Sequence, residues 1–582
     1  MSEIHGDGGP IPIIPDNLTI PQFILDVHHP ARPVLKTPQP WCVDELSGRE
    51  VGSDELRART FGLANALKLR WNIGEDDVVC IFGPNHIDYP VAIWAVHRLG
   101  AIVSGANPAY TAEELEYQLG ATKARVLISH AGSLPVALAA AQKAGIPNDR
   151  VVLFDGVPGA NNVTLDTLVE EGLALPQAFV ERRLAPGEGK KKLAFLSFSS
   201  GTTGRPKVKL SLTCRNAAHG AKSADIMAHY MGVKNQNRPK EIQRYLPGSK
   251  ILALLPFYHI YGLVVVMHFH LFVGTTLVVV QKFNFEQMLN SIQRYRITHL
   301  CLVPPMIVLL CKHPAVKKYD LSSVRMLMSG AAPLSSELTN QLESFLPDCW
   351  IGQAYGMTET CTAVTFPPND RRLGSLGSGG VLLPGCIARV VKPDGSLAGI
   401  GERGELIITG PSMALGYLNN KEATDETFLD GWVRTGDEVY FNERKEIFVV
   451  DRIKELIKVR GFQVPPAELE GHLLDHPDIG DVCVVGIPDE YSGELPLAFV
   501  VPSVSALTQL KEGREEGGVK DAIMKHVADH KVNYKHLVAV EFIEAIPKNP
   551  SGKLLRRFLR DRAKELQNTG KLVLPVRAKA KL

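Results

Sequence analysis

Short apolar runs alternate with amphipathic stretches through most of the chain. The runs Val78–Phe82, Arg125–Ser129 and Val151–Phe154 are largely apolar, which is typical of strands buried on both faces of a parallel sheet. Thr111 and Glu114 have the spacing of a capping box, so we expect a helix to begin there. Strands alternating with helices predict an α/β fold, in which a large N-terminal domain consists of largely parallel sheets flanked by helices.

The pattern changes after Arg452. A helix is predicted to begin at Pro466, followed by strands over Asp481–Gly486 and Leu497–Val501 and a second helix over Val519–His530. Two strands and two helices in this order suffice for a small α+β domain. The end of the chain is therefore predicted to fold separately from the large domain.

Length and composition agree with this division. At 582 residues the chain exceeds one ordinary domain. We place the large domain at residues 1–451, a small mobile domain at 452–570 and a flexible tail at 571–582. Apolar residues make up 45% and charged residues 22%, a balance that can bury a large core. The net charge of +2 offers no basic surface that would favour a nucleic-acid partner.

The most apolar stretch is Leu263–Val280. His268, His270 and the Gly274-Thr275-Thr276 triplet interrupt it, so we expect a core helix that leads into a buried strand, without a transmembrane segment. The nine cysteines include no Cys-x-x-Cys pair, so we expect no zinc site and interpret the cysteines as reduced, mostly packed thiols.

Residues 199–207 read Ser-Ser-Gly-Thr-Thr-Gly-Arg-Pro-Lys and follow a strand-like run, Leu193–Phe198. Glycines allow a tight turn whose amides point inward, and hydroxyls and a lysine add donors for phosphate oxygens. A solvated linker is the alternative, and the loop is not a Walker A motif because Arg205-Pro206 precede the lysine. The candidate phosphate-binding residues are Ser199, Ser200, Gly201, Thr202, Thr203, Gly204 and Lys207.

Six further segments follow this loop in order. They are Leu255–Gly262, Ser329–Pro333, Gln353–Glu359, Trp432–Asp437, Asp451–Lys458 and Pro547–Lys553. Together with the glycine-rich loop they resemble the adenylate-forming superfamily of acyl-CoA synthetases, luciferases and peptide-synthetase adenylation domains. The resemblance extends over nearly the whole chain and is greatest to ligases of the 4-coumarate- and phenylacetate-CoA type.

The resemblance implies a ligase that uses ATP, Mg²⁺ and coenzyme A. A carboxylate would attack the α-phosphorus of ATP, release pyrophosphate and form an acyl adenylate, and the acyl group would then pass to coenzyme A. Lys553 would be the catalytic lysine of the first step, because a cation must neutralise the charge at the transferring centre. Glu359 would hold Mg²⁺ on the phosphates.

The remaining nucleotide site also follows from the resemblance. Thr358 would donate to the α-phosphate, and Tyr355 would stack on adenine. Asp437 would accept the ribose hydroxyls, and Arg452 would add a donor, although Asp451-Arg452 could instead be a turn ion pair. The other residues assigned to ATP or AMP are Gly330, Ala331, Ala332, Gln353 and Gly356.

The acyl site and the second half-reaction involve other residues. His259 is interpreted as the catalytic gate of the acyl pocket, with a packed core histidine as the alternative. Lys454 would be the hinge about which the small domain rotates. After rotation, a coenzyme A site would form. The residues lining the acyl pocket with His259 would be Tyr261, Gly330 and Ala354, and those at the coenzyme A site would be Lys458, Gly461, Phe462 and Gln463.

Two departures from the family pattern bear on activity. Val208–Thr213 replaces a stretch that usually has a small residue, an apolar pair and a helix start. The change is tolerated, weakens phosphate binding, or reflects a local error in the sequence. Ala354 stands where glycine is usual, and the extra methyl group would shorten the pocket. An aromatic acid of the cinnamate or phenylacetate type is therefore predicted, with a medium-chain fatty acid as the alternative.

Other functions remain open at this point. They are a luciferase-like oxygenase, a nucleotide-binding protein with impaired turnover, and an enzyme that loads a separate carrier protein.

The chain ends in Ala580-Lys581-Leu582, which resembles the tripeptide read by the peroxisomal import receptor. Chance in a lysine-rich tail is the alternative. The N-terminal residues lack a secretory pattern, so we expect a peroxisomal protein, or otherwise a cytoplasmic one.

Overall fold

The structure is a computed structural model. It describes residues 3–6, 15–27, 38–198, 239, 243–489, 491–548 and 552–572, and the backbone of 211–215. The predicted phosphate-binding loop Ser199–Lys207, the altered residues Val208–Leu210 and the Ala580–Leu582 tripeptide lie outside these residues and stay predictions.

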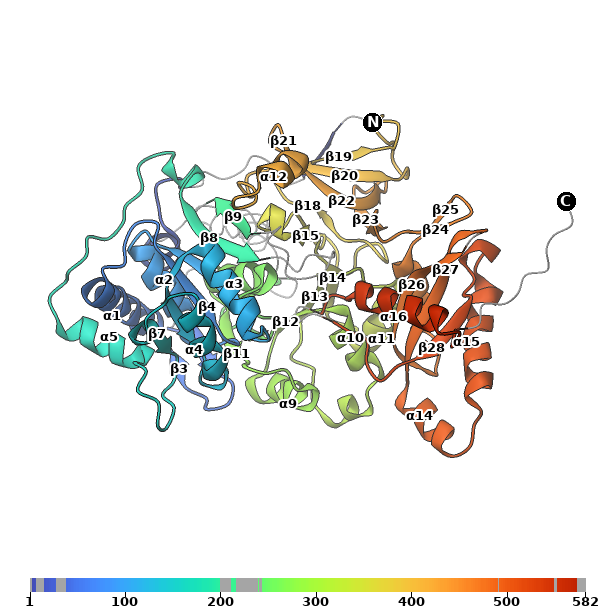
Figure 1. The fold of residues 1–582 in the computed structure, drawn as a ribbon, viewed down its shortest axis with the longest axis horizontal. Helices are drawn as coiled ribbons and strands as arrows, with labels where there is room; N and C mark the ends of the chain where they lie inside the picture. Colours follow the sequence, from blue (N-terminus) through green and yellow to red (C-terminus); the bar gives the residue numbers. More distant parts are fainter. Residues whose placement is uncertain are drawn as a thin grey trace, which may run out of the picture.

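One sheet of the large domain has six strands, in the order β7-β6-β4-β5-β8-β9 (Figure 1). Its strands are β4 (Val78–Phe82), β5 (Ile102–Ala106), β6 (Ala124–Ser129), β7 (Val151–Leu153), β8 (Leu193–Phe198) and β9 (Ser211–Arg215). All its pairs are parallel except β8 with β9. The backbone of β9, which includes Thr213, is a strand that pairs with β8, whereas the usual family pattern has a helix start in this region.

The continuous apolar run of β4 reflects two cores, one on each face of this sheet. Val79 and Ile81 face the core that contains α1 and α2, whereas Val78, Cys80 and Phe82 face the core that contains α3 and α4. The predicted capping box of Thr111 is present at the start of α3. The helices are α1 (Ser53–Trp71), α2 (Tyr89–Arg98), α3 (Ala112–Thr122), α4 (Leu134–Lys143) and α5 (Leu165–Ala174).

A seven-stranded sheet has the order β14-β13-β12-β10-β11-β2-β3 and is parallel except at β2–β3. Its strands are β2 (Cys42–Asp44), β3 (Glu50–Val51), β10 (Lys250–Ala253), β11 (Thr276–Val279), β12 (His299–Leu302), β13 (Met326–Ser329) and β14 (Trp350–Gln353). Helices α9 (Phe285–Tyr295), α10 (Pro304–Lys312) and α11 (Ser336–Phe345) share a core with it.

The buried helix expected within Leu263–Val280 is present. A π-helical segment, Tyr261–Phe269, continues as α8 (His270–Phe272) and leads into β11. His268 accepts a hydrogen bond from the indole of Trp94 in α2 at 3.2 Å, which ties this segment to the first sheet's helices. Within the part of the chain that the structure describes, no helix is long and apolar enough to span a bilayer.

A third sheet is antiparallel, which the sequence did not indicate. It consists of β1 (Ile4–His5), β19 (Ile387–Val391), β20 (Gly404–Thr409), β21 (Phe428–Leu429), β22 (Trp432–Phe441) and β23 (Ile447–Arg452). Buried and partly exposed positions alternate along β20 and β22, because only one face of each strand packs on the core. Smaller elements nearby are β15 (Gly356–Met357), β16 (Thr362–Ala363), β17 (Thr365–Phe366), β18 (Val381–Leu382) and α12 (Lys421–Thr427).

The small domain has its own hydrophobic core, built from residues between Ile457 and Leu572. In Figure 1 its orange and red elements lie beside α10 and α11. A five-stranded sheet packs with four helices, as the α+β pattern predicts. The strands are β24 (Ile457–Val459), β25 (Phe462–Val464), β26 (Ile479–Asp489), β27 (Gly493–Pro502) and β28 (Ala539–Phe542), and the helices are α13 (Pro466–Leu473), α14 (Val504–Lys511), α15 (Glu516–His530) and α16 (Arg556–Asn568).

Candidate active site

The predicted motifs meet where parallel strands of the seven-stranded sheet end. Strand β13 ends at Ser329 and β14 ends at Gln353, and Ala354 donates its amide hydrogen to the carbonyl of Ser329 at 2.9 Å. Residues that follow adjacent parallel strands share one edge of the sheet, which is the usual ligand edge of α/β proteins. Gly330 and Tyr355 are therefore neighbours, although they are 25 positions apart in the sequence.

Tyr355 is held from two sides. Its amide donates to the hydroxyl of Thr365 at 2.8 Å, and its own hydroxyl donates to Oδ2 of Asp437 at 2.6 Å. Burial and the Asp437 carboxylate raise the pKa of Tyr355 well above its usual value, so the hydroxyl stays protonated and acts as a donor. The ring is thus fixed in place for the predicted stacking on adenine. At Gly356 a Cβ would lie 2.2 Å from the Thr362 carbonyl oxygen, so only glycine fits this turn.

Asp437 and Arg452 face each other on paired strands. The register of β22 and β23 aligns the two residues, and the Arg452 Nε lies 2.6 Å from Oδ1 of Asp437. The carboxylate is 3% exposed, and both oxygens already have partners. Since each carboxylate oxygen accepts two hydrogen bonds, Asp437 keeps the capacity for the predicted ribose contact.

Glu359 has the properties expected of a magnesium ligand. It is 8% exposed and accepts a hydrogen bond from the Tyr417 hydroxyl at Oε1, at 2.9 Å. Among the described residues, Oε2 of Glu359 accepts no hydrogen bond, and a hard cation favours such a carboxylate oxygen together with substrate phosphates. Thr358, the other predicted phosphate contact, begins the same short turn. Tyr417 was not predicted, because no sequence pattern links residues 58 positions apart.

The loop that carries Lys553 reaches into this site from the small domain. Gly552 has a φ of +80°, and a Cβ there would lie 2.7 Å from a methyl group of Val303, which follows β12 of the large domain. Burial and the nearby Arg452 cation lower the pKa of Lys553 to about 8, although the carboxylates of Asp437 and Glu359 oppose the shift. The lysine therefore lies among the predicted nucleotide residues, as the first half-reaction requires.

His259 and Tyr261, which are predicted to line the acyl pocket, lie close to Lys553 and Gly330, respectively. Burial and the charge of Lys553 lower the pKa of His259 to about 4, so the ring is neutral at pH 7. The Tyr261 ring lies on Gly330, where a Cβ would be 2.8 Å from the ring edge, and its hydroxyl donates to the Met328 carbonyl at 3.2 Å. A neutral histidine and a fixed aromatic ring form a compact wall suited to a flat acyl group.

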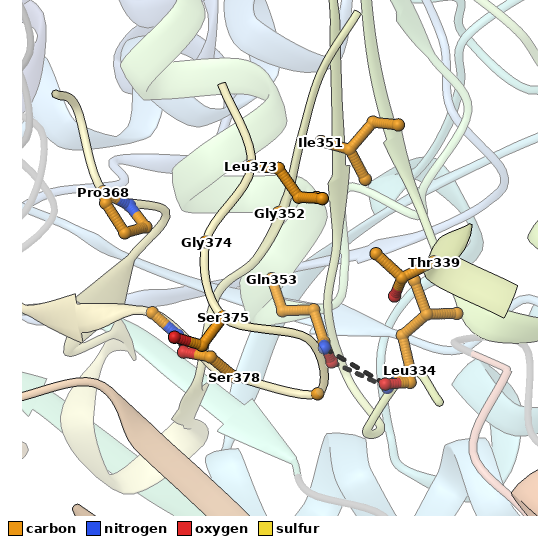
Figure 2. A pocket seen from close by; sticks show the side chains of 12 residues that line it. Leu334, Thr339, Ile351, Gly352, Gln353, Pro368, Leu373, Gly374, Ser375 and Ser378 are labelled. Carbon is orange, nitrogen blue, oxygen red and sulfur yellow. Dashed lines mark hydrogen bonds between the residues drawn. The ribbon is translucent and has the colours of Figure 1, made fainter. Parts of the chain in front are cut away.

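Gln353 has a positioning role in addition to the predicted nucleotide contact. Figure 2 shows its amide turned toward Leu334: Oε1 accepts from the Leu334 amide at 2.6 Å, and Nε2 donates to the Leu334 carbonyl at 3.1 Å. These bonds hold the turn that contains Ala331 and Ala332, and Ala331 has a φ of +69°. A pocket opens beside Gln353 against the loop from Leu373 to Gly380.

The residues predicted for the hinge and for the coenzyme A site are all exposed to solvent. Lys454 is exposed in the turn after β23, and Lys458, Gly461 and Gln463 are exposed on or beside the β24–β25 hairpin. Phe462 is 55% exposed and stacks on Tyr534 of the small domain, with ring centroids 4.5 Å apart. The Phe462–Tyr534 contact is within the small domain, and both the coenzyme A site and the domain rotation that would form it stay predictions.

Comparisons with known proteins agree with this geometry. The profile of the AMP-binding enzyme matches residues 29–418, and that of the AMP-binding enzyme C-terminal domain matches 468–553. The chain is 36% identical over 534 residues to 4-coumarate--CoA ligase 3 of Oryza sativa subsp. japonica, covering 90% of this chain and 89% of that protein. Identity to the probable 4-coumarate--CoA ligase 1 of Dictyostelium discoideum is also 36%, over 574 residues, covering 94% and 96%.

Solved structures share the fold over most of the chain. ATP-bound MatB from Rhodopseudomonas palustris is similar with a TM-score of 0.77 and 25% identity, covering 94% of this chain and 100% of that one. The anthranilate CoA ligase AuaEII in complex with anthranoyl-AMP has a TM-score of 0.80 and 21% identity, covering 95% and 99%. The fold and the site thus define an adenylate-forming enzyme.

The chain belongs to the AMP-binding enzyme family. The predicted family, the α/β fold and the enzyme class are confirmed. The enzyme class is that of the acid–thiol ligases, which act through an acyl adenylate. The roles of individual site residues stay predictions.

Proposed function

We propose that the enzyme uses Mg²⁺ and ATP to activate a compact aromatic acid, of the cinnamate or phenylacetate type, and transfers the acyl group to coenzyme A. The observation that carries the substrate class is the packing of Tyr261 on Gly330, beside Ala354. A flat ring fits against such a wall, whereas a long alkyl chain needs depth that the Ala354 methyl group reduces. Several relatives are named as 4-coumarate ligases, which supports the same class.

In the proposed reaction, each residue of the site has a separate role. The Lys553 cation stabilises the charge that develops as the substrate carboxylate attacks the α-phosphorus, and pyrophosphate leaves. Mg²⁺ held by Glu359 would neutralise the phosphates. Tyr355 and Asp437 orient adenosine. Neutral His259 packs beside the acyl group without adding a second cation near Lys553.

The test is pyrophosphate release from Mg-ATP over a panel of aromatic and fatty acids, with and without coenzyme A. The proposal is supported if an aromatic acid causes pyrophosphate release and if that release increases when coenzyme A is added. Preference for medium-chain acids would overturn the proposed substrate class. If no acid in the panel causes pyrophosphate release although ATP still binds, the result would indicate impaired turnover. Light emission with luciferin would indicate an oxygenase, and dependence on a carrier protein in place of coenzyme A would indicate a carrier-loading enzyme.

Ala354→Gly should shift the preference toward longer acids. Removing the methyl group beside Ser329 deepens the pocket, and a change of one methylene is worth ~1–3 kcal/mol in discrimination, or roughly 10–200-fold. The measurement is the ratio of kcat/KM for a medium-chain acid to that for a cinnamate-type acid. Ala354→Val is the matched control and should move the ratio the opposite way. If both variants move it in the same direction, Ala354 does not set the depth of the pocket.

We also propose that the enzyme is located in the peroxisomal matrix, on the basis of the Ala580-Lys581-Leu582 tripeptide. Deleting Leu582 from a protein that carries an N-terminal fluorescent tag should make a punctate distribution diffuse and leave the ligase activity unchanged. Fluorescence microscopy with a peroxisomal marker measures this. Puncta that persist in the deletion variant would rule out the tripeptide as the targeting signal.

A further inference from the structure

Three histidines from two helices converge in the small domain. His472 lies on α13, and His526 and His530 lie four residues apart on α15, which places them on one helix face. One ring nitrogen from each histidine lies within 4.8 Å of those of the other two. The rings of His472 and His526 stack with centroids 4.2 Å apart, and the His530 ring is 5.2 Å from both.

Each of these rings is oriented by a main-chain carbonyl. Nε2 of His472 lies 3.2 Å from the His526 carbonyl oxygen, and Nε2 of His526 lies 3.3 Å from the His472 carbonyl oxygen. Nδ1 of His530 lies 2.9 Å from the His526 carbonyl oxygen. A nitrogen that faces a carbonyl oxygen carries the proton, so the other nitrogen of each neutral ring keeps a lone pair. Metal-binding histidines characteristically show this arrangement.

The surroundings permit a cation to enter. His472 and His526 are partly buried and His530 is exposed, so the cluster opens to solvent on the His530 side. Two nearby lysines are already paired with carboxylates: Lys525 lies 2.5 Å from Asp529, and Lys531 lies 3.4 Å from Glu468. Their charges are thus partly neutralised before a metal binds.

We propose that His472, His526 and His530 bind a divalent transition metal ion, with Zn²⁺ as the probe. Imidazole nitrogens suit Zn²⁺, Ni²⁺ and Cu²⁺, and three histidines leave a fourth position for water. The sequence predicted no zinc site because the cysteine spacing offered none, whereas this ligand set consists of histidines from two helices. The set is separate from Glu359 and the nucleotide residues.

The bound ion would brace α13 against α15. Helix α13 also touches the large domain, because a Cβ at Gly471, next to His472, would lie 3.0 Å from the Cβ of Ser335. The metal would therefore stiffen the helix that meets the large domain in the adenylate-forming pose. This inference does not depend on the identity of the acid.

The test is calorimetric titration of Zn²⁺ into the full-length, tag-free protein after removal of bound metals, with no ATP present. We expect one ion per chain, and weakening by at least about tenfold in His530→Ala, which loses a ligand at an exposed position and should fold. His476→Gln is the matched control: its ring is 5.3 Å from that of His526, but it is outside the ligand set, so binding should be retained.

Two further readouts separate coordination from nonspecific binding. Co²⁺ in place of Zn²⁺ should give the visible absorption of a four-coordinate site in the wild type and lose it in His530→Ala. Zn²⁺ should raise the thermal unfolding temperature of the wild type but not of that variant. Absence of saturable binding, or equal affinity in wild type and His530→Ala, would overturn the proposal.

Discussion

Lys553→Ala should abolish formation of the acyl adenylate while largely sparing thioester formation from supplied acyl adenylate. The lysine lies near Asp437, Glu359 and Arg452, where the phosphates are predicted to bind. Removing one preorganised donor from a charged transition state costs ~10²–10³-fold in rate, and loss of the whole cation should cost at least that much. Pyrophosphate release measures the first step, and coenzyme A transfer from synthetic adenylate measures the second.

The matched control for this substitution is Lys548→Ala. Lys548 precedes the same loop but pairs with Asp481 of the small domain at 2.5 Å, so its loss should leave the first step nearly unchanged. If Lys553→Ala slowed both half-reactions equally, the assigned role would be wrong, because a residue that acts only in the adenylate-forming pose cannot affect both steps to the same extent.

The same lysine implies a pH dependence. The pKa of Lys553 is lowered to about 8 by burial and by Arg452, and the cation is the active form. Activity should therefore be retained below this pH and decline as the pH rises through about 8, because the charge is lost. The pH profile of kcat/KM for ATP reports the free enzyme and is the appropriate measurement. A profile that stays flat from pH 7 to well above pH 8 would contradict the lowered pKa.

Glu359→Gln should reduce adenylate formation by ~100-fold and raise the Mg²⁺ concentration needed for half-maximal activity. Glutamine can still accept the Tyr417 hydrogen bond through its carbonyl oxygen, so the fold should be retained. The negative charge that attracts Mg²⁺ is lost, together with the stabilisation of the transferring phosphates. A Mg²⁺ titration of pyrophosphate release at fixed ATP measures both effects.

Glu402→Gln serves as the control for the loss of a carboxylate. Glu402 is an exposed residue that pairs with Lys392 at 2.6 Å, so this variant should match the wild type. An unchanged Mg²⁺ dependence in Glu359→Gln would show that another group holds the metal.

Much of the fold was predictable because parallel strands have a strong local signature. Residues such as Val79 and Cys80 face two different cores, so every position of β4 is apolar and the strand is visible in the sequence. The antiparallel sheet was missed, since strands such as β20 and β22 bury only alternate residues. Their weaker pattern resembles that of loops with occasional apolar side chains.

The sequence by itself determined the order of the motifs, the α/β class and the chemical types of the site residues, because these depend on residue identity and local spacing. Only the tertiary structure decided which groups meet. In the folded protein, Tyr417 donates a hydrogen bond to Glu359, and Gln353 accepts one from Leu334. His472 lies beside His526 and His530. Such contacts join residues far apart in the chain, and they form only when the packing of sheets and helices brings distant segments together.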